Sequence, residues 1–135
     1  MPFAAEEYAE LFDRMDEGKT IAFHCTAGKD RTGIAAMLIE MAFNRNLEDI
    51  RSQYMLSNEF RAATNKRILR ILKLFRASKI GIEACMYALT NHVENFDLSI
   101  STILSRYSDI PAFLDKVHGI TPGRVKKWEK FYIEQ

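Results

Sequence analysis

A single candidate β-strand in an otherwise helical pattern constrains the fold of this chain most. The segment Thr20–His24 is short and contains β-branched and aromatic residues. It lies between Gly18 and a glycine-containing loop. The small and apolar residues of Thr32–Phe43 follow that loop and predict a helix buried within a domain. This order of elements is typical of an α/β fold, so we expect a central, loop-bearing strand followed by a mostly helical C-terminal half.

Helical patterns account for most of the remaining chain. Asn46 and Thr121 stand where N-caps are expected, and Pro122 follows at a first helical position. Apolar stripes at helical spacing lie in Tyr8–Met15, Ile68–Phe75, Ile82–Val93, Leu98–Tyr107 and Ile110–Val117. A length of 135 residues suits one domain, which we place over residues 1–135.

The lone strand has no visible partner in the sequence. A strand without neighbours leaves the hydrogen-bonding groups of both edges unpaired. Either a second strand is hidden in the helical pattern, or a second copy of the chain or an N-terminal segment missing from it completes a sheet, and we favour the latter.

Composition and charge narrow the function classes. With 19 basic and 18 acidic side chains, the chain has no charge excess for nucleic-acid binding. Its two cysteines cannot form a disulfide framework, which favours a reducing compartment, and we expect a cytoplasmic protein. The N-terminus has no basic signal region and no apolar run has the length of a transmembrane helix, although export without a signal peptide stays open.

The loop after the strand has the composition of an anion-binding cradle. Its backbone N–H groups and the N-terminus of the next helix would converge on one point, and Gly28 permits a tight turn. Arg31 could hold two phosphate oxygens in a bidentate fork. The residues expected to bind a substrate phosphate are Thr26, Ala27, Gly28, Lys29, Asp30 and Arg31.

Cys25 is the expected nucleophile. Backbone donors and nearby cations would lower the pKa of its thiol, and the thiolate could attack phosphorus to form a phosphocysteine. Asp30 is the nearest acid that could protonate a leaving group and later activate water, since Asp13 and Asp16 read as solvated helix positions. Thr32 is expected to donate a hydrogen bond to the sulfur, and His24 to orient the loop.

The stretch His24–Gly33, H-C-T-A-G-K-D-R-T-G, resembles the loop of the atypical tyrosine phosphatases of bacteria and fungi, which reads H-C-x-x-G-K-D-R-T-G. Leu47–Ile50 with Tyr54–Asn58, and Ile110–Ile120 with Thr121-Pro122, resemble later helices of that family. The resemblance covers most of this chain but only the second half of the family's domain, without its N-terminal strands.

The resemblance implies a cysteine-dependent phosphatase, a hydrolase of phosphomonoesters with a phosphate-binding P-loop. It implies that Asp30 is the acid. In that family, a lysine at the position of Lys29 is associated with activity on phosphoinositides as well as phosphotyrosine. An enzyme that also hydrolyses phosphoserine or phosphothreonine would have dual specificity. The expected partners are phosphorylated proteins or phosphoinositides, and no metal or organic cofactor is implied.

Several alternatives stay open. The chain could be an inactive phosphate-binding half-domain that needs a partner, or an arsenate reductase or sulfurtransferase in which Cys85, otherwise read as core, acts as a second thiol. His92 and His118 have no ligands at metal spacing. One set of basic residues has two explanations: it could form a solvated helix face, or it could contact an anionic membrane surface or a phosphoinositide headgroup. The set comprises Lys66, Arg67, Arg70, Lys73, Arg76 and Lys79.

Overall fold

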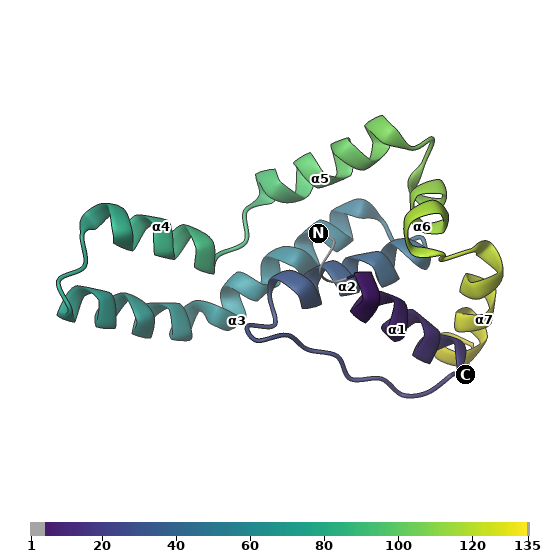
Figure 1. Ribbon diagram of the computed structural model, residues 1–135, viewed down its shortest axis with the longest axis horizontal. Helices are drawn as coiled ribbons and strands as arrows, with labels where there is room; N and C mark the ends of the chain where they lie inside the picture. Colours follow the sequence, from purple (N-terminus) through teal and green to yellow (C-terminus); the bar gives the residue numbers. More distant parts are fainter. Residues whose placement is uncertain (1–4, 135) are drawn as a thin grey trace.

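The computed structural model describes residues 5–134, and within these residues it contains seven helices and no strand (Figure 1). In chain order they are α1 (Ala5–Asp16), α2 (Asp30–Ala42), α3 (Leu47–Leu74), α4 (Lys79–Leu89), α5 (Val93–Arg106), α6 (Ile110–His118) and α7 (Pro122–Tyr132).

The prediction of an α/β fold with a central strand at Thr20–His24 is wrong for the described residues. This segment has no regular secondary structure and forms part of the long connection between α1 and α2 (Figure 1). Its β-branched and aromatic residues have strand propensity, but a strand is defined by ladder hydrogen bonds to a neighbour. Among residues 5–134, no neighbour forms that ladder.

The helix starts that the sequence predicts are confirmed. The side chain of Asn46 accepts a hydrogen bond from the Glu48 N–H at 2.8 Å, and Thr121 caps α7 through the N–H of Arg124 at 3.3 Å. Each bond satisfies a backbone donor that has no partner within its own helix. The stripe at Ile68–Phe75 differs from the expectation, because α3 runs without a break from Leu47 to Leu74.

The body of the molecule, formed by α1, α2, α6 and α7, contains the largest buried side chains. The first predicted stripe is confirmed, since its apolar residues Tyr8, Leu11, Phe12 and Met15 are all buried. Phe12 and Trp128 are fully buried, with ring centroids 5.8 Å apart. Burial of such aromatic rings removes a large apolar area from water and stabilises the packing of α1 against α7.

A polar cluster reinforces the contact between α1 and α7. The indole N–H of Trp128 donates to Asp16 Oδ1 at 2.6 Å, and the Arg124 guanidinium binds Asp16 and Asp13, both at 2.9 Å. The expectation that Asp16 is a solvated position is therefore wrong. Gly18, at the end of α1, has φ +67°, and a Cβ there would meet the Phe131 ring at 2.9 Å. Only glycine fits this turn without displacing α7.

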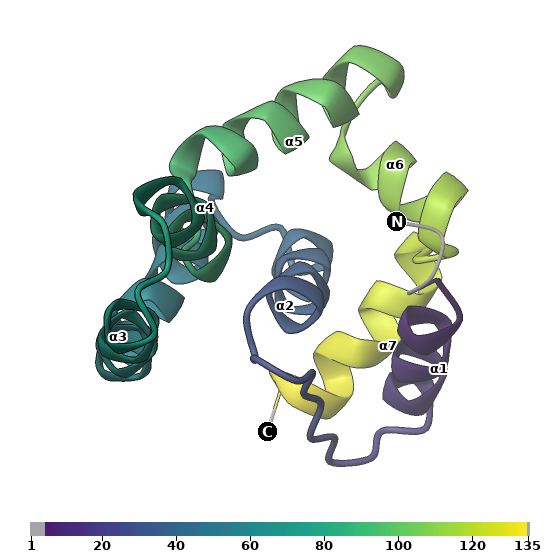
Figure 2. The same ribbon diagram turned by 60° about the vertical axis from the view of Figure 1, so that its left-hand side comes forward.

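The helices α3 and α4 extend away from the body as an antiparallel pair (Figure 1). We call residues 61–89 the arm. In Figure 2, which turns the arm forward, α2 lies between α3 on one side and α1 and α7 on the other. No helix among the described residues is long and apolar enough to cross a membrane.

Candidate functional site

The loop that carries Cys25 ends at the N-terminus of α2. Lys29 is the N-cap of this helix, and Asp30 is its first residue. Gly28 has φ +63°, in the left-handed region, while a Cβ there would meet no atom within 4 Å. The left-handed backbone conformation therefore favours glycine at this position, whereas a side chain would have room. The tight turn expected at Gly28 is present.

The thiol of Cys25 faces a group of hydrogen-bond donors. A hydrogen bond from the Thr32 hydroxyl is the largest influence and lowers the pKa of Cys25 to about 6, with further help from the backbone N–H groups of Thr32, Ala27 and Lys29. Burial acts in the opposite direction. The donors prevail, so most of this sulfur is thiolate at neutral pH.

Thr32 reaches the sulfur from the first turn of α2. Its hydroxyl is buried and makes no hydrogen bond of ordinary geometry with any described residue, the Cys25 sulfur included, yet its interaction with that sulfur lowers the pKa of the thiol. The same turn presents backbone donors at the positive end of the helix dipole. The bond from Thr32 to the sulfur therefore stays a prediction.

Arg31 lies beside Cys25 on an exposed face. Among the described residues, its guanidinium makes no hydrogen bond or ion pair, whereas its backbone carbonyl accepts a 3.1 Å hydrogen bond from the Tyr8 hydroxyl. A cavity of about 120 Å³ is lined by Cys25, Arg31 and Thr32. Arg31 and Cys25 thus line the same cavity, and the backbone of Arg31 is hydrogen-bonded to α1 through Tyr8.

Asp30 and Lys29 form an ion pair at the rim of the loop. The Lys29 Nζ lies 2.9 Å from Asp30 Oδ1, but the lysine side chain is buried and the carboxylate is exposed. Nζ also donates to the carbonyls of Ala88 at 2.9 Å and Thr90 at 3.4 Å. These carbonyls lie at the C-terminal end of α4, where a cation is favoured, so Lys29 connects the loop to the arm.

Arg61 provides a second connection between the arm and the loop, which the sequence analysis missed. Its Nη1 donates to the Ala27 carbonyl at 2.7 Å. This contact fixes the peptide plane between Ala27 and Gly28, because the six atoms of a peptide unit move together. The amides of Ala27 and Lys29, on either side of this plane, are among those that donate to the Cys25 sulfur.

The remaining loop residues are exposed. His24 lies with Nδ1 3.4 Å from the Cys25 carbonyl, a long contact that is compatible with the predicted orienting role. Thr26 is exposed in the loop next to Cys25. The predicted site residues are consecutive in the sequence, and in the structure the Lys29 side chain turns toward the arm.

A polar network joins α3 to the turn between α4 and α5. The Asn91 backbone N–H donates to Asn58 Oδ1 at 2.7 Å, and the Asn91 side chain donates to Ser57 Oγ at 2.7 Å and to the Tyr54 carbonyl at 2.8 Å. Asn91 is almost fully buried. This network fixes the end of α4, whose carbonyls bind Lys29.

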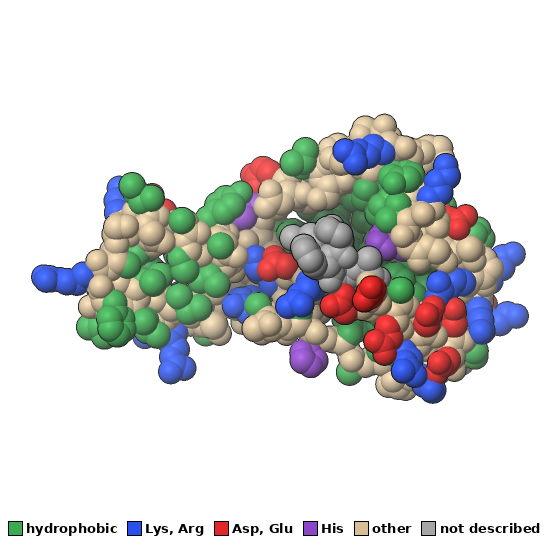
Figure 3. Space-filling view, in the orientation of Figure 1, with side chains coloured by type: hydrophobic (Ala, Val, Ile, Leu, Met, Phe, Trp, Pro, Cys, Tyr) green, Lys and Arg blue, Asp and Glu red, His purple; other side chains and the backbone are tan. Residues whose placement is uncertain are grey.

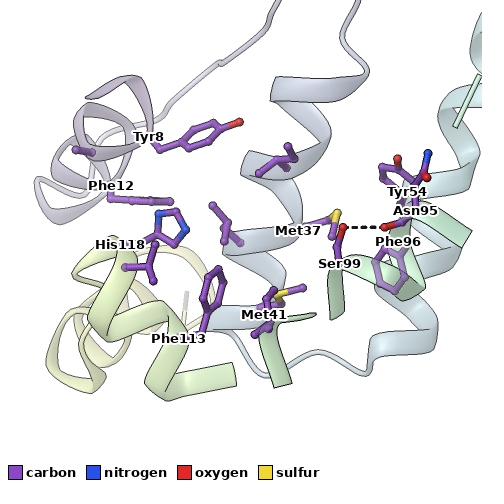
Figure 4. Close-up of a pocket in the computed structure, with 15 residues that line it drawn as sticks. Tyr8, Phe12, Met37, Met41, Tyr54, Asn95, Phe96, Ser99, Phe113 and His118 are labelled. Atoms are coloured by element: carbon purple, nitrogen blue, oxygen red, sulfur yellow. Dashed lines mark hydrogen bonds between the residues drawn. The ribbon is translucent and has the colours of Figure 1, made fainter. Parts of the chain in front are cut away.

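The largest cavity lies away from the loop. It has a volume of about 640 Å³ and lies between α1, α2, α5 and α6, with Phe12, Met37, Phe113 and His118 around it (Figure 4). Burial lowers the pKa of His118, whose ring packs edge-on against Phe12 and Phe113. No residue of the Cys25 loop lines this cavity, and its lining is mostly apolar, with Asn95, Ser99 and His118 among its polar members.

The other candidate side chains have ordinary surroundings. Cys85 is half-buried on α4, and it and Cys25 are free thiols. His92 stacks on the Tyr87 ring with centroids 3.9 Å apart. The described part of the chain contains no cluster of three or more His, Cys, Asp or Glu side chains that could hold a metal ion.

Comparison with known proteins identifies the family. The chain belongs to the tyrosine phosphatase family, whose sequence profile matches residues 1–134. A protein of Cupriavidus necator, named as a candidate tyrosine-protein phosphatase, is 44% identical over 64 residues. The match covers 47% of this chain and 23% of that relative, so the chain spans well under two thirds of its length. No solved structure gave a significant match.

Proposed function

We propose that this chain carries the catalytic loop of a cysteine-dependent protein-tyrosine phosphatase. The observation that carries the proposal is the environment of Cys25, where the Thr32 hydroxyl and three backbone amides lower the pKa of the thiol to about 6. A phosphoryl group bound at this point would meet the same donors. Its oxygens, like the thiolate, are negatively charged and are stabilised by hydrogen-bond donors.

In the first step, the Cys25 thiolate attacks the phosphorus atom of the bound phosphomonoester. A sulfur–phosphorus bond forms as the bond from phosphorus to the tyrosine oxygen breaks, and the leaving phenoxide takes a proton from Asp30. This role requires Asp30 to be protonated in the substrate complex, in place of the carboxylate that pairs with Lys29 in the structure. The charge on the transferring phosphoryl oxygens is stabilised by the loop amides and by the guanidinium of Arg31, an exposed residue that lines the same cavity as Cys25.

In the second step, water attacks the phosphocysteine. Asp30, now a carboxylate, accepts a proton from that water, and the Cys25 sulfur leaves as thiolate while inorganic phosphate forms. The Thr32 hydroxyl stabilises the departing sulfur through the hydrogen bond that also lowers the pKa of the resting thiol. The exposed carboxylate of Asp30 at the rim of the loop has access to the water that this step consumes.

Phosphotyrosine is the substrate that we favour over phosphoinositides. The resemblance of the loop associates Lys29 with lipid substrates, but its ammonium group is buried against the C-terminal end of α4. Recognition of a second phosphate by this group would require the loss of its contact with the Ala88 carbonyl. Dual specificity toward phosphoserine and phosphothreonine belongs to the same proposal and is tested with the corresponding phosphopeptides.

The test is hydrolysis of a small aryl phosphate by the purified chain, with vanadate as inhibitor. We expect turnover that vanadate suppresses and that Cys25→Ser abolishes. Cys85→Ser serves as the matched control, because Cys85 lies on α4 and is absent from the cavity that Cys25 lines. Trapping of the phosphocysteine after rapid acid quench would identify the intermediate.

Three results would contradict the proposal. Turnover that survives Cys25→Ser would exclude this nucleophile. Phosphate binding without turnover by the folded chain would instead favour a binding module. Activity that depends on Cys85 as well as Cys25 would favour a two-thiol reaction such as arsenate reduction.

A further inference from the structure

The tip of the arm exposes large apolar side chains to solvent. Leu74 at the end of α3, Phe75 in the following turn and Ile80 in the first turn of α4 are 78%, 79% and 79% exposed. None of the residues of α4 is buried. Single exposed apolar residues are common. Three within seven positions, at the turn that joins α3 to α4, form a patch that needs an explanation.

The same part of the chain is strongly basic. Residues 60–82 contain seven Lys and Arg side chains and no Asp or Glu. At the tip itself Lys73, Arg76 and Lys79 are exposed, and the nearest acidic partner is Glu83, 4.0 Å from Lys79. Figure 3 shows apolar side chains gathered on the projecting end of the molecule, with basic side chains at its outer edges.

We propose that the tip of the arm binds the surface of an anionic lipid bilayer. Leu74, Phe75 and Ile80 would enter the boundary between headgroups and acyl chains, while the surrounding Lys and Arg side chains contact the lipid phosphates. The arm places this patch at the end of the molecule farthest from the body (Figure 1).

The combination of charge and apolar exposure favours a bilayer over other partners. A second copy of the chain would bring two acid-free basic surfaces together in a symmetric pair, and their repulsion would oppose association. A nucleic acid would neutralise the cations but leave Phe75 and its apolar neighbours in water. An anionic bilayer surface satisfies both groups of side chains, since it is negative at the headgroups and apolar beneath them.

This inference does not depend on the proposed phosphatase function, because the contact uses no residue of the Cys25 loop. It describes attachment to a surface and not a span, since no described helix could cross a membrane. Attachment would hold the loop near the membrane surface, because α3 connects the tip to Arg61, which binds the loop.

The test is co-sedimentation of the full chain with vesicles of phosphatidylcholine alone, or of phosphatidylcholine with about 30% phosphatidylserine. We expect binding to the anionic vesicles to be about tenfold tighter than to the neutral ones, and to weaken as salt rises from about 0.1 M to about 0.5 M. The triple variant Leu74→Ser, Phe75→Ser, Ile80→Ser and the triple variant Lys73→Gln, Arg76→Gln, Lys79→Gln should each lose most of the binding.

The matched control is a triple variant at exposed apolar residues of the other helices: Leu98→Ser, Leu104→Ser and Ile133→Ser. It removes three exposed apolar side chains away from the arm and should bind anionic vesicles like the parent chain. Circular dichroism and the hydrolysis of an aryl phosphate should be unchanged in the tip variants, which shows that they fold.

Equal binding to neutral and anionic vesicles, or no loss of binding in either tip variant, would overturn the proposal. A concentration-dependent dimer that the apolar tip variant abolishes, with no vesicle binding by the parent chain, would assign the patch to a second copy. The vesicle assay reads binding directly, so an inactive chain that still binds anionic vesicles would overturn the proposed function and leave this inference standing.

Discussion

In the body, apolar side chains from α1, α2, α6 and α7 are removed from water, whereas in the arm most side chains remain exposed and several others are only half-buried. Phe12 and Trp128 are fully buried in the body, and Asn65 is the one residue of the described arm classed as buried. The contacts that connect the arm to the Cys25 loop are polar: Arg61 binds Ala27, and Lys29 binds Ala88.

This difference indicates that one set of contacts stabilises the fold and another set positions the atoms of the Cys25 loop. Apolar burial contributes most of the free energy that holds the body together, but it is non-directional and fixes atoms only loosely. Hydrogen bonds contribute less net free energy and depend on distance and angle, so they determine where a peptide plane lies. We expect mutations in the body to change stability, and mutations at the junction of arm and loop to change reactivity.

The largest effect is expected from Trp128→Ala in the body. The substitution removes a fully buried ring and its hydrogen bond to Asp16, and should lower the free energy of unfolding by about 3–5 kcal/mol. Urea denaturation followed by circular dichroism measures it, because this residue is the single tryptophan and fluorescence is lost with it. Trp128→Phe, which keeps most of the apolar ring, should cost less. A loss below about 1 kcal/mol for Trp128→Ala would contradict the role assigned to the body.

The next effect is expected from Arg61→Met at the junction. Loss of the hydrogen bond to the Ala27 carbonyl should free the loop amides, lower kcat for an aryl phosphate by about tenfold or more and raise the pKa of Cys25. Stability should change little. The pH dependence of Cys25 alkylation by iodoacetamide reports the pKa, and a role in stability alone would leave it unmoved.

Arg67→Met is the matched control for this prediction. Arg67 is exposed on the same helix and has no hydrogen bond or ion pair with the described residues. Its substitution removes the same charge without touching the loop, so kcat and the pKa of Cys25 should stay at the parent values. Equal effects of the two substitutions would attribute the change to net charge instead of loop position.

Thr32 lies on α2, a helix of the body, and influences the Cys25 sulfur. Thr32→Val should change the reactivity of Cys25 less than Arg61→Met does. The Thr32 hydroxyl is the largest influence that lowers the pKa of Cys25 from 9.0 to about 6. Without it, more of the sulfur is protonated at a given pH. An upward shift of about one unit would reduce the thiolate at pH 7 from roughly nine tenths to roughly one half. The alkylation rate plotted against pH should therefore move to higher pH, and an unmoved midpoint would exclude this hydrogen bond.

Local signals in the sequence predicted the buried face of α1 and two helix starts correctly. The periodicity of Tyr8–Met15 identified the buried face of α1, and the caps at Asn46 and Thr121 identified two helix starts. These features depend on residues within one or two turns of each other, so a single sequence contains the information. The clustering of Cys25 with its donors is similarly local, because all of them lie within eight residues.

Features that depend on distant residues were missed or wrong. The strand at Thr20–His24 failed because strand formation needs a neighbour, and propensity alone does not supply one. The contacts of Arg61 with Ala27 and of Lys29 with Ala88 span 34 and 59 residues, and no local pattern distinguishes Arg61 from the other basic residues of α3. The position of the arm relative to the loop was therefore not accessible from periodicity.

The smallest effect on stability is expected from Phe75→Ala at the tip of the arm. The Phe75 ring is 79% exposed, so its removal takes away little buried apolar area and leaves no internal cavity. The free energy of unfolding should change by less than about 0.5 kcal/mol in the same urea experiment that detects Trp128→Ala. A loss approaching that of Trp128→Ala would mean that the ring is covered in solution, by a second copy or by a further part of the protein. A dependence of that loss on protein concentration would separate these two cases, because self-association follows mass action and an intramolecular contact does not.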